Sequence, residues 1–544
     1  MGMRPSSAAS QASPLRFGAP LAAAAVLGVL AGYPLWRLAA EALSGGGMGD
    51  ALSATGLRTA AFNSLWTSAA AATLAAAAGT AVALLTERYR IRGATALRVA
   101  MVGTLIVPPF VSAVSWQATY APFGLLDDLT GLSGGWIDGR VGVVVVIAVN
   151  VAPLAFLVVA AALRGSRLGD VERAARAAGA ADAATLRSIT LPLIRPALAA
   201  AWLVGFAAAL ANFGVTTVLG TSAGFDTLTT RVYRAIAFSA REAAFQEAVA
   251  MALILVLLAL VVIALTDSRF VSGRMTGLAD PTTGRIGSMA PAPPGAAALA
   301  WGYLTLSLML PLGGLVLRAL TRAVGVSASP GNWTLANFRA VWDARTWEAL
   351  GRSAALAASA ALLALAVAGL LVFVSRTGNR RWGSAAAVMF AVPGTSIALA
   401  VSLGYGRWIA NTAAIILVAY VAKLLVLAHR PLAGSAVSIH PDLLRAGRAA
   451  GAGPGGLLRW IVAPMLRSAI VAGAVLAFVF AVHELTMSSL LRGPGNETLA
   501  VVVLDYQQIG DPTVTAALAV VLAIVIAVVA APLLWLRRVW GAPQ

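Results

Sequence analysis

Few residues of this 544-residue chain are of a type that does covalent chemistry. There is no cysteine, which excludes disulfides and thiolate metal sites, and the three histidines form no pair or catalytic triad. Lys423 is the only lysine, and a leucine follows it. The Gly-x4-Gly-Lys-Ser/Thr loop that holds nucleotide phosphates therefore cannot be built. We expect no catalytic residues and no cofactor in this chain, so any ATP must be hydrolysed by another subunit.

A second group of residues could bind a solute. They are polar and lie inside long apolar stretches, where such side chains are costly and often functional. The candidates for a substrate pathway are Asn150, Asn212, Tyr420, His483 and Glu484. A hard cation prefers oxygen ligands, which Glu484 could supply, although an interfacial salt bridge explains it equally well. The asparagines could equally hold neighbouring helices together. Lys423 is interpreted as extending to the membrane surface. No tight metal site is defined.

The apolar stretches themselves indicate membrane spans. The chain is 60% hydrophobic and 11% charged, with a mean hydropathy of +0.86. A helix needs roughly 20 apolar residues to cross a bilayer. About twelve segments qualify: 17–40, 64–85, 97–119, 141–163, 197–219, 244–266, 296–320, 351–375, 383–405, 411–429, 468–490 and 514–536. The first could be a signal peptide, but its length and its likeness to the seventh favour a retained helix.

The net charge of +18 would fit a nucleic-acid-binding protein, but its distribution points elsewhere. With the N-terminus in the cytoplasm and twelve spans, the cytoplasmic segments hold most of the arginines and a third of the acids. This is the excess of positive charge expected on the inner side of a membrane protein. We therefore expect a lipid bilayer and no nucleic acid as a partner, and both termini in the cytoplasm.

An internal repeat divides the chain in two. Residues 176–180 recur as residues 448–452, and further matches at the same spacing of 272 run from Asp170 and Asp442 to Arg195 and Arg467. A Gly-, Pro- and Ser-rich stretch, 267–295, separates the copies and is predicted to be a cytoplasmic linker. The fold class is then an all-α polytopic membrane protein with two six-helix halves, 1–266 and 296–544. An even number of spans in each half implies a pseudo-twofold axis along the membrane normal.

Each copy of the repeat lies in a cytoplasmic loop, residues 164–196 (the first loop) or 430–467 (the second loop). In each, a short Arg/Ala-rich helix is predicted to stop at a glycine, Gly179 or Gly451, because glycine suits a left-handed turn. Helix resumes and enters the next span near a proline, Pro192 or Pro464, which suits a first helical turn. The product would be a short helix held rigidly on a transmembrane helix, like a lever. A basic loop touching lipid headgroups is the alternative.

At these residues the chain resembles the inner-membrane permeases of binding-protein-dependent ABC importers. Their signature is Glu-Ala-Ala, three residues, Gly, nine residues, Ile, one residue and Leu-Pro. The matching residues are Ala174, Ala175, Gly179, Ile189 and Pro192 in the first loop, and Ala446, Gly451, Ile461 and Pro464 in the second. Arg173 and Arg445 occupy the position of the glutamate, and Gly447 and Ala463 also depart from the pattern.

The resemblance implies a type I ABC importer permease in the bacterial inner membrane. Its two loops would couple to a homodimeric ATP-binding subunit that holds ATP and magnesium, and an external substrate-binding protein would deliver the solute. Two fused halves resemble permeases for ferric iron, and the thiamine permeases are closely similar. Stretches around Asn212–Gly214 and His483–Leu485 resemble the iron group and would line the external gate. A secondary transporter is less favoured because no span has an acid near its centre, and a membrane enzyme would need clustered catalytic residues.

Overall fold

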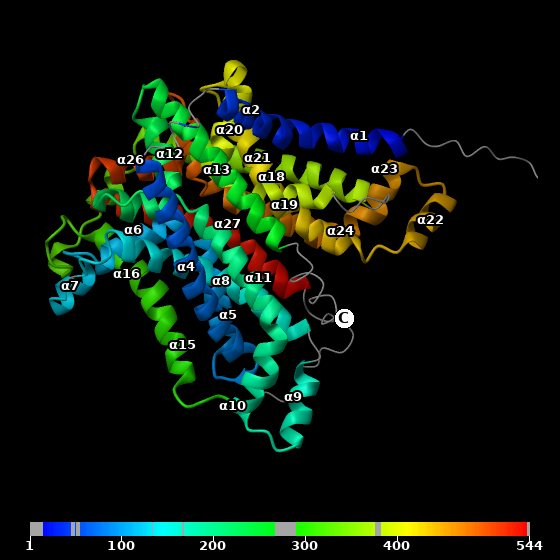
Figure 1. The fold of residues 1–544 in the computed structure, drawn as a ribbon, viewed down its shortest axis with the longest axis horizontal. Helices are drawn as coiled ribbons and strands as arrows, with labels where there is room; N and C mark the ends of the chain where they lie inside the picture. The colour runs from blue at the N-terminus through cyan, green and yellow to red at the C-terminus, as the bar shows by residue number, and fades with distance from the viewer. Residues whose placement is uncertain are drawn as a thin grey trace, which may run out of the picture.

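The computed structural model describes residues 15–44, 49, 55–132, 134–165, 168–266, 290–375 and 382–540 (Figure 1). Apart from a two-residue parallel pair and one isolated bridge, these residues form helices and loops. The pair joins Tyr89–Arg90 (β1) to Ala290–Pro291 (β2). It places the end of the predicted linker beside the residues that follow the second span. Residues 267–289 of the linker, like both chain ends, lie outside the described residues.

The chain up to the linker contains these elements: α1 Leu15–Leu27, η1 Gly28–Gly32, α2 Tyr33–Ser44, α4 Thr55–Glu87, α5 Ala94–Gly103, η2 Thr104–Ile106, α6 Pro109–Tyr120, α7 Leu125–Thr130, α8 Arg140–Gly165, α9 Leu168–Ala177, α10 Asp182–Thr185, η3 Leu186–Thr190, α11 Leu191–Leu210, η4 Thr216–Gly220, η5 Thr221–Ala223, α12 Leu228–Ala237 and α13 Glu242–Thr266. After the linker come α15 Ala296–Leu304, η6 Thr305–Met309, α16 Leu310–Leu320, η7 Pro330–Asn332, α17 Ala336–Ala340, α18 Ala344–Ser375, α19 Trp382–Ala391, α20 Gly394–Ile409, α21 Ala413–Ala436, α22 Pro441–Ala449, α23 Pro454–Leu457, η8 Leu458–Val462, α24 Ala463–Val482, α25 Thr486–Leu491, α26 Leu499–Ile509 and α27 Pro512–Trp540.

Ten of the described helices are long and apolar enough to cross a membrane, and an eleventh is added if one bent pair counts as a single span. The twelve continuous spans predicted from sequence are therefore not found. The third predicted span is the bent pair, α5–η2 and α6, which turns by 106°. The ninth is divided into α19 and α20, of 10 and 16 residues. Both breaks fall at proline, Pro108 and Pro393, whose extended backbone and missing N–H interrupt a helix.

Two further predicted spans have the wrong bounds. The fifth was expected over 197–219 and the eleventh over 468–490, but the helices run over Asp182–Leu210 and Pro454–Val482. Each begins inside a loop, so α10, η3 and α11 form one continuous rod, as do α23, η8 and α24. Each helix also ends earlier than predicted, at Leu210 and Val482, where the helix is interrupted and the chain continues. Close packing accompanies the first break, because a Cβ on Gly214 would lie 2.8 Å from the Cβ of Phe110 in α6.

The two parts of the chain exchange their first spans. The first span packs through α2 on α20, and the seventh packs through α16 on α6 (Figure 1). Both exchanged spans carry a π-turn, η1 or η6, shortly before a proline. The carbonyls near these turns accept hydrogen bonds from the other part of the chain: Tyr405 donates to Val29 and Tyr120 to Leu306, each at 2.5 Å. These two hydrogen bonds fasten each exchanged span to the other part of the chain at its π-turn.

Candidate functional site

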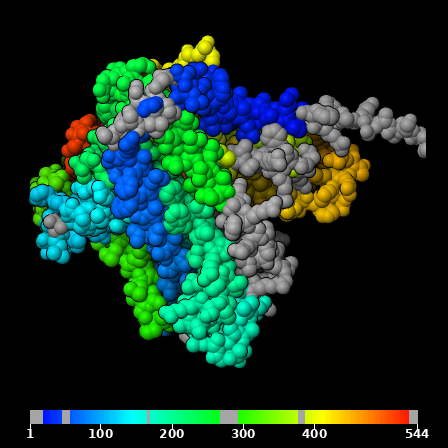
Figure 2. All heavy atoms as spheres, viewed as in Figure 1, coloured from blue at the N-terminus to red at the C-terminus, as the bar shows by residue number. Residues whose placement is uncertain are grey.

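The first and second loops have the same order of elements at the predicted spacing of 272. In the first, α9 ends at a turn and α10 and η3 lead into α11. In the second, α22, α23, η8 and α24 follow the same order. The helices α9–α10 and α22–α23 form two separate projections from the helical body in Figure 1, and Figure 2 shows them as lobes on its surface. At the opposite end of the molecule lie α7, α12 and α26.

The predicted glycine turns are present in both loops. Gly179 has φ = 85° and Gly451 has φ = 83°, in the left-handed region. In the first loop, the amide of Ala180 donates to the carbonyl of Ala175 at 2.9 Å. The amide of Ala452 makes the equivalent bond to Gly447 at 3.0 Å. These bonds satisfy the last carbonyls of the short helices, so each helix stops at a defined residue and the chain reverses into the rod behind it.

The other motif residues lie on both sides of these turns. Ala174 and Ala446 are exposed on the short helices, while Ile189 and Ile461 lie in the π-turns just before Pro192 and Pro464. The prolines stand in the first turn of α11 and α24, directly after the π-turns, and proline has no N–H to donate to the preceding turn. The π-turns were not predicted, because no residue pattern marks them.

Arg173 and Arg445, at the position of the family's glutamate, are surface residues. Each pairs with the acid three residues earlier on its own short helix, Arg173 with Asp170 and Arg445 with Asp442. Such exposed pairs contribute little to stability. Both guanidinium groups are therefore placed on the outer face of a loop, where a partner could reach them.

Gly447, which stands where the family has its second alanine, has a packing reason. A Cβ at this position would come within 2.6 Å of a Leu457 methyl and 2.7 Å of an Ile461 methyl. The equivalent positions in the first loop hold Ala175 and Thr185, a larger residue with a smaller one. In the second loop the smaller glycine is therefore paired with the larger leucine, and in the first loop the larger alanine is paired with the smaller threonine.

Sequence reasoning missed a buried polar network that holds the first loop. Arg88, directly after α4, donates from Nε to Glu172 at 2.9 Å and from Nη2 to Asp182 at 2.8 Å. Thr190 also donates to Glu172, and the Tyr89 hydroxyl donates to Asp182 at 2.8 Å. The side chains of Arg88 and Glu172 are only 3% and 6% exposed. The available signal was an acid adjacent to the motif and a basic turn after the second span.

The charge state of this network follows from its contacts. Burial alone would lower the pKa of Arg88, but the hydrogen bonds with Asp182 and Glu172 hold that pKa above its ordinary value. Burial raises the pKa of Tyr89 to about 12, and the bond to Asp182 acts in the same direction. Arg88 is therefore a cation and Tyr89 a neutral donor at physiological pH.

Three of the five pathway candidates, Asn212, His483 and Glu484, lie at the breaks that follow α11 and α24, and Tyr420 of α21 contacts the second break. Asn212 and Glu484 are equivalent at the spacing of 272, and their side chains do the same work. Asn212 accepts a hydrogen bond from the amide of Val215, and Glu484 from the amide of Met487, both at 3.0 Å. Tyr420 donates to the Glu484 carbonyl at 3.2 Å, and buried His483 contacts the ring of Phe480.

Lys423 belongs to this region as well. Its ammonium donates to the carbonyl of Val392 at 2.9 Å, at the break between α19 and α20. The interpretation that Lys423 extends to the membrane surface is therefore wrong. A buried carbonyl without a helical partner is satisfied here by the only lysine of the chain.

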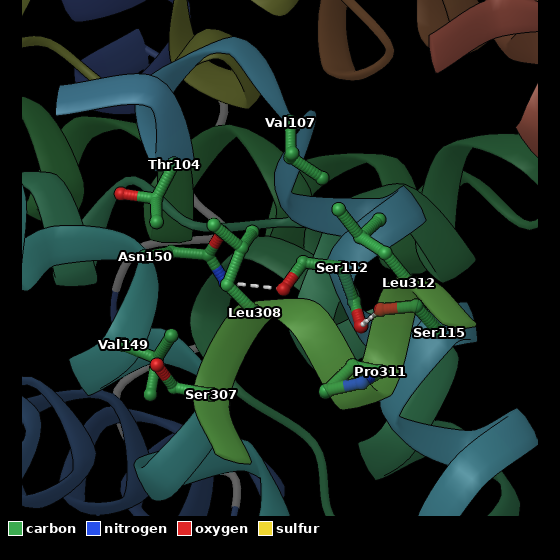
Figure 3. A pocket seen from close by; sticks show the side chains of 10 residues that line it. All are labelled: Thr104, Val107, Ser112, Ser115, Val149, Asn150, Ser307, Leu308, Pro311 and Leu312. Carbon is green, nitrogen blue, oxygen red and sulfur yellow. Dashed lines mark hydrogen bonds between the residues drawn. The ribbon is translucent and has the colours of Figure 1, made fainter. Parts of the chain in front are cut away.

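Asn150 lies apart from the other pathway candidates. Its amide donates to Ser112 at 3.2 Å and to the carbonyl of Val146 at 2.7 Å. It lines a small cavity, with Ser115 and Ser307, between α6, α8 and η6 (Figure 3). The cavity volume is about 10 Å³, the space that one water molecule needs. Within the described ranges, three or more His, Cys, Asp or Glu residues do not gather into a possible metal site.

Comparison with known proteins relates the chain to transport permeases. Residues 77–272, which contain the first loop, match a family model described as a binding-protein-dependent transport system inner membrane component. A probable ABC transporter permease protein, y4fN, of Sinorhizobium fredii is 25% identical over 487 residues, which cover 84% of this chain and 83% of that protein.

Two ferric transport proteins are also similar. The Fe(3+)-transport system permease protein FbpB 2 of Haemophilus influenzae is 25% identical over 445 residues, or 79% of this chain and 80% of that protein. The ferric transport system permease protein FbpB of Actinobacillus pleuropneumoniae is 31% identical over 182 residues, or 32% of this chain and 26% of its own length.

Proposed function

Because this chain is an inner-membrane permease component of a binding-protein-dependent transport system, we propose that it conducts ferric iron through an ATP-driven importer. It is the permease and not the ATPase subunit. Such a system implies an ATPase and a substrate-binding protein as partners. In the proposal the ATPase is a homodimer that holds ATP and magnesium, and the binding protein docks on the external face.

The repeated loops carry the proposal. Each is a short helix closed by a left-handed glycine and continued by an unbroken rod into the membrane. Two such projections fit one copy each of a homodimeric partner. We assign the coupling role to the motif residues of 164–196 and 430–467, with Arg173 and Arg445 on the outer faces. The halves are 1–266 and 296–544, related by a pseudo-twofold axis and joined by the linker 267–295.

The far ends of the two rods supply the gates. ATP binding would draw the loops together, and α11 and α24 would pass this motion to the breaks at Asn212 and Glu484. The breaks would open towards the docked binding protein, and hydrolysis would restore the inward-facing state. This is alternating access between two halves without covalent chemistry in this chain.

The choice of ferric iron rests on the printed names of relatives that are 25–31% identical. Glu484 supports it, because its carboxylate is the acid among the pathway candidates and oxygen ligands suit a hard cation. A tight resident metal site is not required in a conduit, since an external binding protein can select the solute. The alternative solute is thiamine or another small organic compound.

Uptake into proteoliposomes tests the proposal. The permease is reconstituted with its ATPase and with the binding protein loaded with ferric iron, and uptake and ATP hydrolysis are measured together. We expect ATP-dependent iron uptake and stimulation of hydrolysis by the loaded binding protein. Stimulation by thiamine, with none by ferric iron, would overturn the iron assignment and leave the importer assignment standing. Uptake without ATP, driven by an ion gradient, would overturn both.

A further inference from the structure

The end of α4 lies between two ionic clusters formed by consecutive residues. Glu87 faces one side, where it pairs with Arg98 at 2.9 Å and Arg164 at 2.5 Å. Arg88 faces the other and pairs with Glu172 and Asp182 of the first loop. The second span is thereby tied to the third and fourth spans through Glu87 and to the loop through Arg88.

Arg88 is the central residue of the second cluster. Its contacts reach α9 through Glu172 and the start of the α10–α11 rod through Asp182. Thr190, in the π-turn, donates to the same Glu172 carboxylate. One guanidinium group thus joins both arms of the first loop, on either side of the turn at Gly179. Removal of one partner would leave a buried charge uncompensated, which is strongly destabilising.

The equivalent positions of the second loop are apolar. At the spacing of 272, Glu172 corresponds to Leu444, Asp182 to Pro454 and Thr190 to Val462. Leu444 and Val462 are partly buried against an apolar cluster of α18, α21 and α24. At these positions the two loops, alike in backbone, are held by different interactions: hydrogen-bonded ion pairs in the first and apolar contact in the second.

We propose that Arg88 is a positioning residue that locks the first loop to the second span through Glu172 and Asp182, whereas the second loop is positioned at the equivalent residues by apolar packing. The inference rests on the proposed coupling role of the loops. Force applied to α9 would reach α4 and α11 together, because Arg88 joins them. The two copies of the ATPase would then act on two loops that are held differently, the first by ion pairs and the second by apolar contact.

Spin labels on the complete permease measure the attachment directly. The chain has no cysteine, so single cysteines at Ala178 and Ala450, exposed equivalents next to the two glycine turns, take the label selectively. We expect Arg88→Gln to raise label mobility several-fold at Ala178 and to leave it unchanged at Ala450. Leu444→Ala should do the reverse. Arg98→Gln is the matched control, since it removes a cationic partner of Glu87 without touching the loop.

Two further variants keep the test decisive. Glu172→Gln retains the shape of the side chain and should loosen Ala178 if Arg88→Gln does not fold, and Arg88→Lys should restore part of the rigidity. Equal mobility at Ala178 in wild type, Arg88→Gln and Glu172→Gln would overturn the proposal.

Transport by the same variants separates this inference from the proposed function. In the Arg88→Gln permease that folds and co-purifies with the ATPase, iron uptake per ATP hydrolysed should fall several-fold. A loosened loop with wild-type uptake would leave the role of Arg88 as a lock in place and would overturn the coupling role of the first loop. Uptake lost while the label stays rigid would overturn the positioning role.

Discussion

Single residues fix the shape of the two loops, and Gly179 and Gly451 do so through backbone conformation alone. A Cβ at either position would meet nothing within 4 Å, yet φ is 85° at Gly179 and 83° at Gly451. Substitution is therefore opposed by the left-handed conformation and not by a clash. An L residue with a Cβ loses roughly 1–2 kcal/mol in this region, and asparagine loses less.

This difference gives a matched pair of variants. We expect the double variant Gly179→Val, Gly451→Val to assemble with less ATPase and to lose most uptake, because β-branched residues resist φ > 0. The double variant Gly179→Asn, Gly451→Asn should keep most of both. Co-purification of the ATPase and uptake by proteoliposomes are the measurements. Wild-type uptake by a well-folded valine variant would contradict the coupling role of these turns.

Glu484 allows charge to be separated from geometry. Its Oε1 accepts the amide of Met487, just as the neutral Asn212 accepts the amide of Val215 at the equivalent break. Glu484→Gln can preserve this hydrogen bond and removes only the negative charge. We expect several-fold slower uptake of ferric iron, with assembly and basal ATP hydrolysis near wild type. If uptake is unchanged in Glu484→Gln but lost in Glu484→Ala, the side chain serves as a helix cap and not as a cation ligand.

At the scale of elements, packing inside the second loop can be tested by an exchange of volume. Gly447→Ala would press on Leu457 and Ile461, whose methyl ends must shift, at a cost of about 1 kcal/mol. Adding Leu457→Thr reproduces the pair found in the first loop, Ala175 with Thr185. We expect Gly447→Ala to lower the melting temperature of the permease and the double variant to regain it. Additive losses in the double variant would show that the two loops pack differently.

Sequence reasoning found the elements that depend on local residue types and missed those that depend on contacts. Glycine and proline have intrinsic backbone preferences, so the sequence predicted the turns at Gly179 and Gly451 and the helices that begin near a proline. The repeat was visible as matching residues at one spacing. Hydropathy could not locate the ends of the fifth and eleventh spans, since apolar residues recur among the polar ones beyond Leu210 and Val482. The π-turns are local but have no residue pattern of their own, and the Arg88 network joins residues 84 and 94 positions apart.

Across the whole molecule, the exchanged first spans and the paired loops make one argument about function. The chain before the linker supports the first span after it, and the chain after the linker supports the first span before it. The rods α10–α11 and α23–α24 cross between the loops at one end and the breaks at the other. An arrangement of this kind can convert an approach of the two loops into an opening between the halves, which is what the proposed importer requires.

Sidedness is the whole-molecule property that this mechanism demands. The end of the linker pairs with the residues after α4, beside the network that holds the first loop. The loops and the linker should therefore share the cytoplasmic side with both chain ends, and the segment between α16 and α17 should face outside.

Cysteines at Ala178, Ala450 and Ser288 should react with a membrane-impermeant thiol reagent only after cells are permeabilised, whereas a cysteine at exposed Ser327 should react in intact cells. The native chain contributes no background, because it has no cysteine. Labelling of Ser288→Cys in intact cells would contradict this topology, and labelling of Ala178→Cys would place the first loop beyond the reach of a cytoplasmic ATPase.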